Sequence, residues 1–157
     1  MTMRLDPLRV ADAAEMVGVL AAPELYEFIG GRPPTLGELT EQYRRQVVGR
    51  SVDGREEWLN WIVRVHGTAV GYVQATVHEG ARAVVAWVVG APWQGRGYAT
   101  AAAAELVGLL RGRGVRRIEA YIVPGHTGSE RVAARVGLAP TGHLSEGEQM
   151  WLAVTPD

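Results

Sequence analysis

A glycine-rich segment, QGRGYA at residues 94–99, offers the clearest chemistry in the sequence. It separates an apolar run from an alanine-rich stretch, so we expect it to join the end of a buried strand to the start of a helix. Glycine lets the main chain come close to a ligand, and a helix start offers unpaired N–H groups and the positive end of a dipole. The segment therefore predicts a site for a phosphate or pyrophosphate, to which Arg96 can add positive charge.

The same segment has three other interpretations: a Walker loop, a dinucleotide-binding loop, and a helix start that binds nothing. A Walker loop needs a lysine followed by serine or threonine, which this segment lacks. A dinucleotide loop needs a third glycine or an alanine where Thr100 stands. It also needs an acidic residue at the end of the next strand, whereas Glu119 lies within that strand. The residues of the segment alone leave the bare helix start open.

The composition is that of an ordinary globular domain, and it removes several kinds of chemistry. The chain has 157 residues, 47% of them apolar and 21% charged, which fits a single domain over residues 1–157. A net charge of −1 predicts no nonspecific binding to nucleic acid or to a membrane. The lack of cysteine excludes disulfides, cysteine-bound metals and an acyl-cysteine intermediate, and four scattered histidines predict no metal site. The start of the chain has no signal-peptide core, which predicts a cytoplasmic protein.

The elements that must position the segment follow from the periodicity of apolar residues. We expect helices at residues 10–20, 24–29, 35–48 and 128–136, and a further helix directly after the segment. We expect a short strand at the start, three antiparallel strands within 57–90, a parallel strand at 116–123 and a final hairpin around 145–147. Thr35 and Glu38 have the spacing of a capping box. The pattern predicts an α+β domain with a mixed, mostly antiparallel sheet of six to seven strands flanked by about four helices.

The segment and the order of the elements together resemble the GNAT acetyltransferases. In that family the pattern Gln/Arg-x-x-Gly-x-Gly/Ala forms the acyl-CoA pyrophosphate loop, which QGRGYA matches. The resemblance covers essentially the whole chain, with specific motifs at residues 88–142. The stretches RLDPLRVADAAEM and SERVAARVGL are most similar to the Rim-type branch, which acetylates N-terminal amines of ribosomal proteins and related small amines.

The resemblance implies an acetyl-CoA-dependent N-acetyltransferase. The acetyl group would move directly to a primary amine of a small molecule or of a peptide or protein N-terminus, without a covalent enzyme intermediate. A non-catalytic CoA-binding or regulatory module of the same fold is the alternative. Homodimers are frequent in the family, but the sequence points to no interface residue.

By this resemblance, the cofactor site comprises the strand before the loop, the loop itself and the start of the last helix. The residues so assigned are Trp87, Val88, Val89, Gln94, Gly95, Arg96, Gly97, Tyr98, Ala99, Thr100, His126 and Ser129. In the family, two strands separate at this point and pantetheine lies between them. The N–H of Val88 or Val89 would then face the thioester carbonyl.

Two side chains that many family members use in catalysis are replaced here. Val84, or a neighbour, stands where a glutamate serves as base, and Ala133 stands where a tyrosine protonates the thiolate. Ser129 is the remaining candidate to stabilise the thiolate by a hydrogen bond, unless it only caps the last helix. His126 replaces an asparagine of the branch, as a donor to pantetheine or as an exposed loop residue.

The base that takes the proton of the amine is expected near Val84. If the preceding turn is centred on residues 80–81, Val77 pairs with Val84 and His78 is next along the strand. The ordinary pKa of histidine suits this task, which makes His78 the candidate base and Glu79 the second choice.

The acceptor itself can make a base unnecessary. An N-terminal α-amine, with a pKa of about 7.7–8.0, loses its proton far more readily than a lysine side chain at about 10.4. Tyr26 and Glu27 lie where the first two helices of the family form the acceptor wall, so both are expected to contact the substrate.

Overall fold

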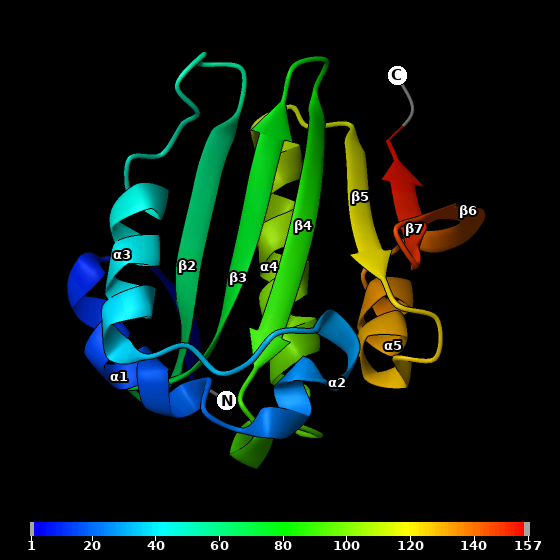
Figure 1. The fold of residues 1–157 in the computed structure, drawn as a ribbon. Helices are drawn as coiled ribbons and strands as arrows, with labels where there is room; N and C mark the ends of the chain where they lie inside the picture. Colours follow the sequence, from blue (N-terminus) through cyan, green and yellow to red (C-terminus); the bar gives the residue numbers. More distant parts are fainter. Residues whose placement is uncertain (1, 156–157) are drawn as a thin grey trace.

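A seven-stranded sheet with the strand order β1-β2-β3-β4-β5-β7-β6 forms the centre of the molecule (Figure 1). The computed structural model describes residues 2–155 of the chain. The strands are β1 (Met3–Pro7), β2 (Glu57–Val65), β3 (Thr68–His78), β4 (Arg82–Val89), β5 (Arg117–Ile122), β6 (Ala139–Ser145) and β7 (Glu148–Val154). Neighbouring strands are antiparallel except β4 and β5, which are parallel. The predicted mixed, mostly antiparallel sheet is therefore confirmed.

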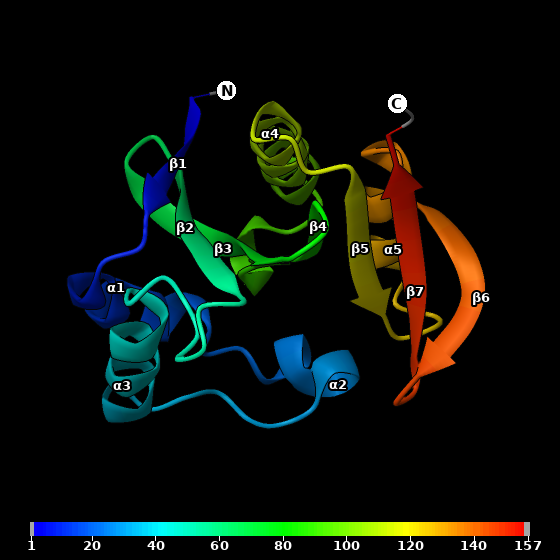
Figure 2. The same ribbon diagram turned by 90° about the horizontal axis from the view of Figure 1, so that it is seen from above.

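Helices cover both faces of this sheet. They are α1 (Ala13–Val19), α2 (Tyr26–Ile29), α3 (Leu36–Gln46), α4 (Tyr98–Gly112) and α5 (Thr127–Arg135). Figure 2 shows α1 and α3 on one side of β2 and β3, with α4 on the other side. The predicted capping box opens α3: the Glu38 N–H donates to the Thr35 hydroxyl (3.2 Å), and the Thr35 N–H donates to the Glu38 carboxylate (2.9 Å).

The alternation of side chains along the strands separates two hydrophobic cores. On β2, Val63 belongs to the larger core with Leu106 of α4, and Ile62 belongs to the smaller core with Met16 and Leu39 of the N-terminal helices. Neighbouring strand residues point to opposite faces, so the choice of face is fixed by the parity of the residue number. Residues that share the face of Ile62 can therefore line a site between the sheet and helices α1–α3.

The β3–β4 hairpin differs by one residue from the predicted register. Val84 pairs with Thr76, not with Val77, and His78 pairs with Arg82. The predicted turn had two central residues, but the observed connection has three, because Ala81 also takes a positive φ of 58°. Since side chains alternate between faces, a shift of one residue changes which β3 side chain lies opposite Val84.

The junction between β4 and β5 is short. Only three residue pairs join these strands, and the last of them is Val84 with Glu119. Beyond it the strands diverge, and Figure 1 shows β5 leaning away from β4 toward the end that leads to α5. We call the paired end of this junction the closed end and the divergent end the open end. The loop at residues 94–97 follows β4 at the open end.

A buried carboxylate fixes the closed end. Glu119 is 2% exposed and accepts hydrogen bonds from Arg82 of β4 (2.7 Å), Arg117 (2.7 Å) and the Tyr121 hydroxyl (2.9 Å). Burial raises the pKa of Glu119, but these three donors outweigh it and bring the pKa down to about 2. The charge therefore stays on the carboxylate at neutral pH and ties β4 to β5.

Candidate active site

Main-chain groups of β4 line one side of the open end. The N–H of Gly90 donates to the C=O of Val70 on β3 (2.8 Å). Because the main-chain groups of successive strand residues point to opposite edges, Trp87 and Val89 direct theirs toward β5, whereas those of Val88 point toward β3. Strand β5 pairs with β4 no further than Val84, so these edge groups face the gap. Of the two N–H groups expected at a thioester carbonyl, this geometry favours Val89.

The glycine-rich loop continues directly from this edge. The Gln94 side chain donates to the C=O of Val89 (3.0 Å), which holds the loop against the end of β4. Gly95 and Gly97 have φ angles of +78° and +83°, a region that glycine adopts without strain. The N–H of Ala101 donates to the C=O of Gly97 as the first bond of α4.

Six consecutive N–H groups of the loop and helix start have no main-chain partner. Within residues 2–155, no N–H from Gly95 to Thr100 donates to a main-chain carbonyl. The 15-residue helix α4 adds the positive end of its dipole at this point, and the Arg96 side chain is exposed beside it. The arrangement is suited to an anion with several oxygens, such as a pyrophosphate.

The start of α5 lies on the far side of the gap. Its cap is His126, and Ser129 is the third helical residue, so Ser129 does not cap the helix. No described hydrogen bond involves the Ser129 hydroxyl, which leaves it available to a ligand. The His126 ring stacks flat on Phe28 of α2, with 4.4 Å between ring centroids and 2° between planes. Burial lowers the pKa of His126, against a smaller opposite effect of Glu130, which favours a neutral ring.

The structure does not bring the predicted base to the gap. His78 lies at the closed end, where its Nδ1 is 3.8 Å from a carboxylate oxygen of Glu56. Arg82, its partner on β4, is seven residues from Val89, or roughly 23 Å along the strand. Glu79 lies in the adjacent turn. The catalytic role of either residue stays a prediction without support from this geometry.

The two positions where the usual catalytic side chains are replaced, Val84 and Ala133, both carry apolar side chains. Ala133 is fully buried within the larger core. Val84 is the last β4 residue paired with β5. Neither position supplies a group that could hold or move a proton.

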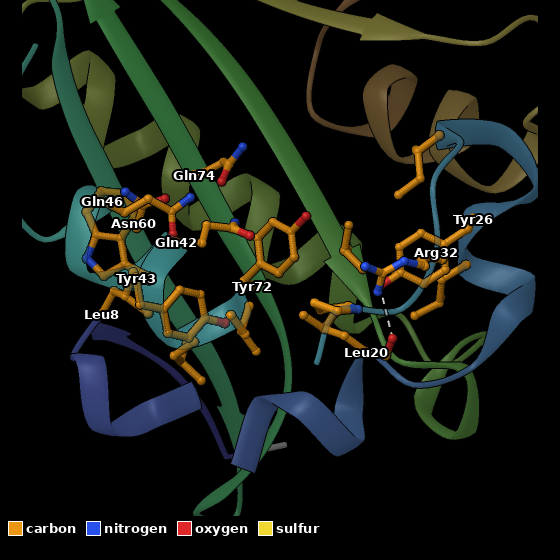
Figure 3. Close-up of a pocket in the computed structure, with 17 residues that line it drawn as sticks. Leu8, Leu20, Tyr26, Arg32, Gln42, Tyr43, Gln46, Asn60, Tyr72 and Gln74 are labelled. Carbon is orange, nitrogen blue, oxygen red and sulfur yellow. Dashed lines mark hydrogen bonds between the residues drawn. The ribbon is translucent and has the colours of Figure 1, made fainter. Parts of the chain in front are cut away.

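A pocket on the opposite side of β4 contains residues that sequence reasoning missed. It lies between α2, α3 and the sheet, and Val88 of β4 forms part of its wall (Figure 3). Its polar side chains are Tyr26, Arg32, Gln42, Tyr43, Gln46, Asn60, Tyr72 and Gln74. Of the two predicted substrate contacts, Tyr26 lines the pocket and its hydroxyl donates to the C=O of Leu20 (2.9 Å), whereas Glu27 is exposed and outside the lining.

The pocket tyrosines remain protonated at neutral pH. Burial raises the pKa of Tyr72 to about 12, with a smaller effect of Tyr26, and burial also raises the pKa of Tyr43. Tyr72 pairs with Val88 across β3 and β4, so its ring stands next to the strand that borders the gap. The pairing of β2 with β3 could have indicated Tyr72. Tyr72 lies directly opposite Ile62 in that pairing, so both side chains point to the face of the sheet that the N-terminal helices cover.

The comparison with protein families decides the class of this site. A model of the acetyltransferase (GNAT) domain matches residues 2–139. The chain belongs to the GNAT acetyltransferase family. This confirms the predicted family and the predicted enzyme class, an acetyl-CoA-dependent acyltransferase. It also favours the acyl-CoA interpretation of the loop over the dinucleotide one.

Solved structures support the GNAT fold over the whole chain. RimL, a ribosomal alpha-N-protein acetyltransferase in complex with coenzyme A, has a TM-score of 0.85 at 13% identity, covering 99% of this chain and 95% of its own. The aminoglycoside acetyltransferase AAC(6')-Ib in complex with coenzyme A has a TM-score of 0.80 at 21% identity, covering 98% and 95%. An acetyltransferase from Thermus thermophilus has a TM-score of 0.81 at 20% identity, covering 98% and 97%. A search of curated protein sequences finds no significant match.

Two further observations concern the GNAT domain as a whole. In residues 2–155, no helix is both long and apolar enough to cross a membrane. In the same part of the chain, no three histidine, aspartate or glutamate side chains are grouped so that they could hold a metal ion.

Proposed function

We propose that this GNAT acetyltransferase moves the acetyl group of acetyl-CoA directly to a primary amine, with an α-amine as the preferred acceptor. One observation carries the proposal. The gap between β4 and β5 has free main-chain N–H groups of Trp87 and Val89 along one edge and six N–H groups at its mouth, and Val88, which lies between those two residues, lines a pocket on the neighbouring face of the sheet. The cofactor and the amine therefore approach β4 from its two sides.

The loop and the gap would hold the cofactor through main-chain groups. The pyrophosphate accepts hydrogen bonds from the N–H groups at residues 95–100, and Arg96 adds charge. Pantetheine runs between the diverged strands and pairs with Trp87 and Val89. The N–H of Val89 donates to the thioester oxygen, where negative charge grows as the amine attacks.

The transfer needs few side chains. The amine nitrogen forms a bond to the thioester carbon, the C–S bond breaks, and the proton lost by the nitrogen neutralises the thiolate directly or through water. The Ser129 hydroxyl stabilises the thiolate by donating a hydrogen bond. The pocket lining contains no carboxylate and no histidine, so the amine enters the reaction already neutral. This favours an α-amine, whose pKa of about 7.7–8.0 leaves a useful neutral fraction at pH 7.

Thermal unfolding with and without acetyl-CoA tests the cofactor site. A ligand at about 100 times its Kd stabilises the folded state by about 2.7 kcal/mol. For a domain of this size, Tm should rise by roughly 5–10 °C. Gly97→Glu puts bulk and negative charge at the anion site, so it should abolish this rise.

Gly80→Glu is the matched control for Gly97→Glu. Both glycines have a positive φ (+81° and +83°), and neither has another atom within 4 Å of an added Cβ. The two variants therefore introduce the same strain and the same charge, but Gly80 lies in the β3–β4 turn. A Tm rise that survives in Gly97→Glu would contradict the assignment of the loop. A rise without thiol release for any amine would favour the non-catalytic CoA-binding module.

A further inference from the structure

The acceptor pocket has an unusual electrostatic character for an enzyme that binds amines. Its lining has four carboxamides, three phenols and one guanidinium, and none of its seventeen residues is an aspartate, glutamate or histidine. The guanidinium, Arg32, is bound by both carboxylate oxygens of Glu38 (2.8 and 2.6 Å), which lies outside the lining. Arg32 is therefore already paired, and the pocket offers no negative charge to a cation.

A pocket lining without negative charge discriminates between acceptors by their charge. A second ammonium group carried into the pocket would lose its hydration without meeting a carboxylate in the lining. Carboxamides both donate and accept hydrogen bonds, so they match the paired N–H and C=O of a peptide group. Figure 3 shows Gln42, Gln46, Asn60 and Gln74 grouped on the same side of the pocket as Tyr43 and Tyr72.

A second, independent observation points to a ligand in this pocket. Tyr43 is 3% exposed, lines the pocket, and its hydroxyl has no hydrogen-bond partner in the described part of the chain. A buried hydroxyl without a partner is costly, and native proteins rarely keep one without a purpose. A polar group of the acceptor that enters the pocket can supply the missing partner.

We infer that the acceptor is an α-amine followed directly by an amide group, with no second positive charge, as in an uncharged peptide N-terminus. This inference rests on the proposed function, since it names the substrate of the same site. The amine meets the thioester beside Val88, and the amide and first side chain lie against the carboxamides and Tyr43. Polycationic amines such as aminoglycosides should be the poorest acceptors.

Thiol release from acetyl-CoA with a matched set of acceptors tests the inference. The set is Ser-Ala-Ala amide, Ser-Lys-Ala amide, Lys-Ala-Ala amide and kanamycin. We expect kcat/KM for the neutral peptide to exceed that for each lysine-containing peptide by at least tenfold, with the least release from kanamycin. Equal or faster release with a lysine peptide or kanamycin would overturn the inference. So would an absence of release with the neutral peptide while acetyl-CoA still raises Tm. Loss of the Tm rise itself would instead overturn the proposed function.

Two substitutions sharpen the test without touching the cofactor loop. Gln74→Glu adds a carboxylate to the pocket, so it should shift the preference toward Ser-Lys-Ala amide by tenfold or more. Gln149→Glu on β7 adds the same charge outside the pocket and should leave the preference unchanged. A preference that does not move in Gln74→Glu would contradict the role of charge.

Tyr43→Phe separates binding from stability. Removing an unpartnered hydroxyl should leave Tm unchanged or raise it, because nothing in the folded protein bonds to that oxygen. If the hydroxyl bonds the acceptor, kcat/KM for Ser-Ala-Ala amide should fall threefold to tenfold while the KM for acetyl-CoA stays the same. Unchanged kinetics would remove Tyr43 from the acceptor site.

Discussion

The two ends of the β4–β5 junction differ in the contacts that they make: the closed end has paired strands and buried charges, and the open end has unpaired main-chain groups. At the closed end, three residue pairs join the strands and the buried Glu119 is bound by arginines from both of them. At the open end, the strands present main-chain groups to a gap, and the adjoining loop is largely glycine and unpaired N–H. The closed end holds the angle between the strands, and in the proposed function the open end admits the cofactor. Substitutions at one end should therefore change stability, and substitutions at the other should change binding.

The largest expected effect is at the closed end. Glu119→Gln removes the charge that Arg82 and Arg117 share and should cost about 3 kcal/mol of unfolding free energy. Tm should fall by roughly 6–12 °C. The rise of Tm on adding acetyl-CoA should persist, because the loop is unchanged.

Glu41→Gln, which breaks the exposed pair with Arg44, is the control and should change Tm by at most about 2 °C. Loss of acetyl-CoA binding in Glu119→Gln would show that the two ends are not separable.

Gly71→Ala probes the open end from the β3 side. A Cβ on Gly71 would lie 2.1 Å from the carbonyl oxygen of Val88 and 2.9 Å from the Cα of Val89, so β4 must move. Overpacking of this kind costs roughly 1–3 kcal/mol. The displaced segment also carries the N–H proposed to face the thioester, so kcat should fall more than the loss of stability explains.

Gly108→Ala is the control for the previous variant. Gly108 is an exposed residue of α4 with nothing within 4 Å of an added Cβ, and alanine should stabilise the helix by about 0.8–1 kcal/mol. Unfolding in urea measures both free energies, and thiol release measures kcat. Full activity in Gly71→Ala would contradict the claim that the position of β4 matters for the reaction.

The contribution of Glu119 to the free energy of unfolding should decrease gradually as the pH falls. The folded-state pKa of Glu119 is about 2, below its ordinary value of 4.5, so its contribution to stability is complete above pH 4.5 and is lost as pH falls toward 2. Of the roughly 3 kcal/mol involved, about 2 should disappear between pH 6 and pH 3. Urea unfolding across this range, in the wild type and in Glu119→Gln, measures the effect. The free energy of unfolding of Glu119→Gln should fall less between pH 6 and pH 3 than that of the wild type. An equal fall in the two proteins would assign the acid sensitivity to other carboxylates.

The geometry of the loop that we propose to hold the cofactor could be predicted from the sequence because its signals are local. Residues 94–100 are consecutive, and their glycines, the helix start and the preceding strand are all visible in one stretch. The capping box of Thr35 and Glu38 was predictable for the same reason. The fold followed from the order of such local signals together with the family resemblance.

Apart from Tyr26, the residues of the pocket were not predictable, because they come from separate elements, chiefly α3, β2 and β3. Tyr43 and Tyr72 meet only after the sheet has formed, and neither belongs to a motif. A register that differs by one residue in the β3–β4 hairpin was enough to misplace the partner of Val84. Likewise, the role of Glu119 depends on Arg82, which is 37 residues away in the sequence and adjacent only across a parallel pair.

The short junction also has a consequence for how the molecule opens. Strands β1–β4 and strands β5–β7 each pair among themselves, with one break in the pairing of β6 with β7, but only three residue pairs connect the two groups. They should therefore exchange their amide hydrogens as two cooperative units with different protection. In the free protein, the amides of Trp87 and Val89 should exchange early. A pantetheine chain bound between the strands would act as the missing strand, slow that exchange, and make the two units unfold as one.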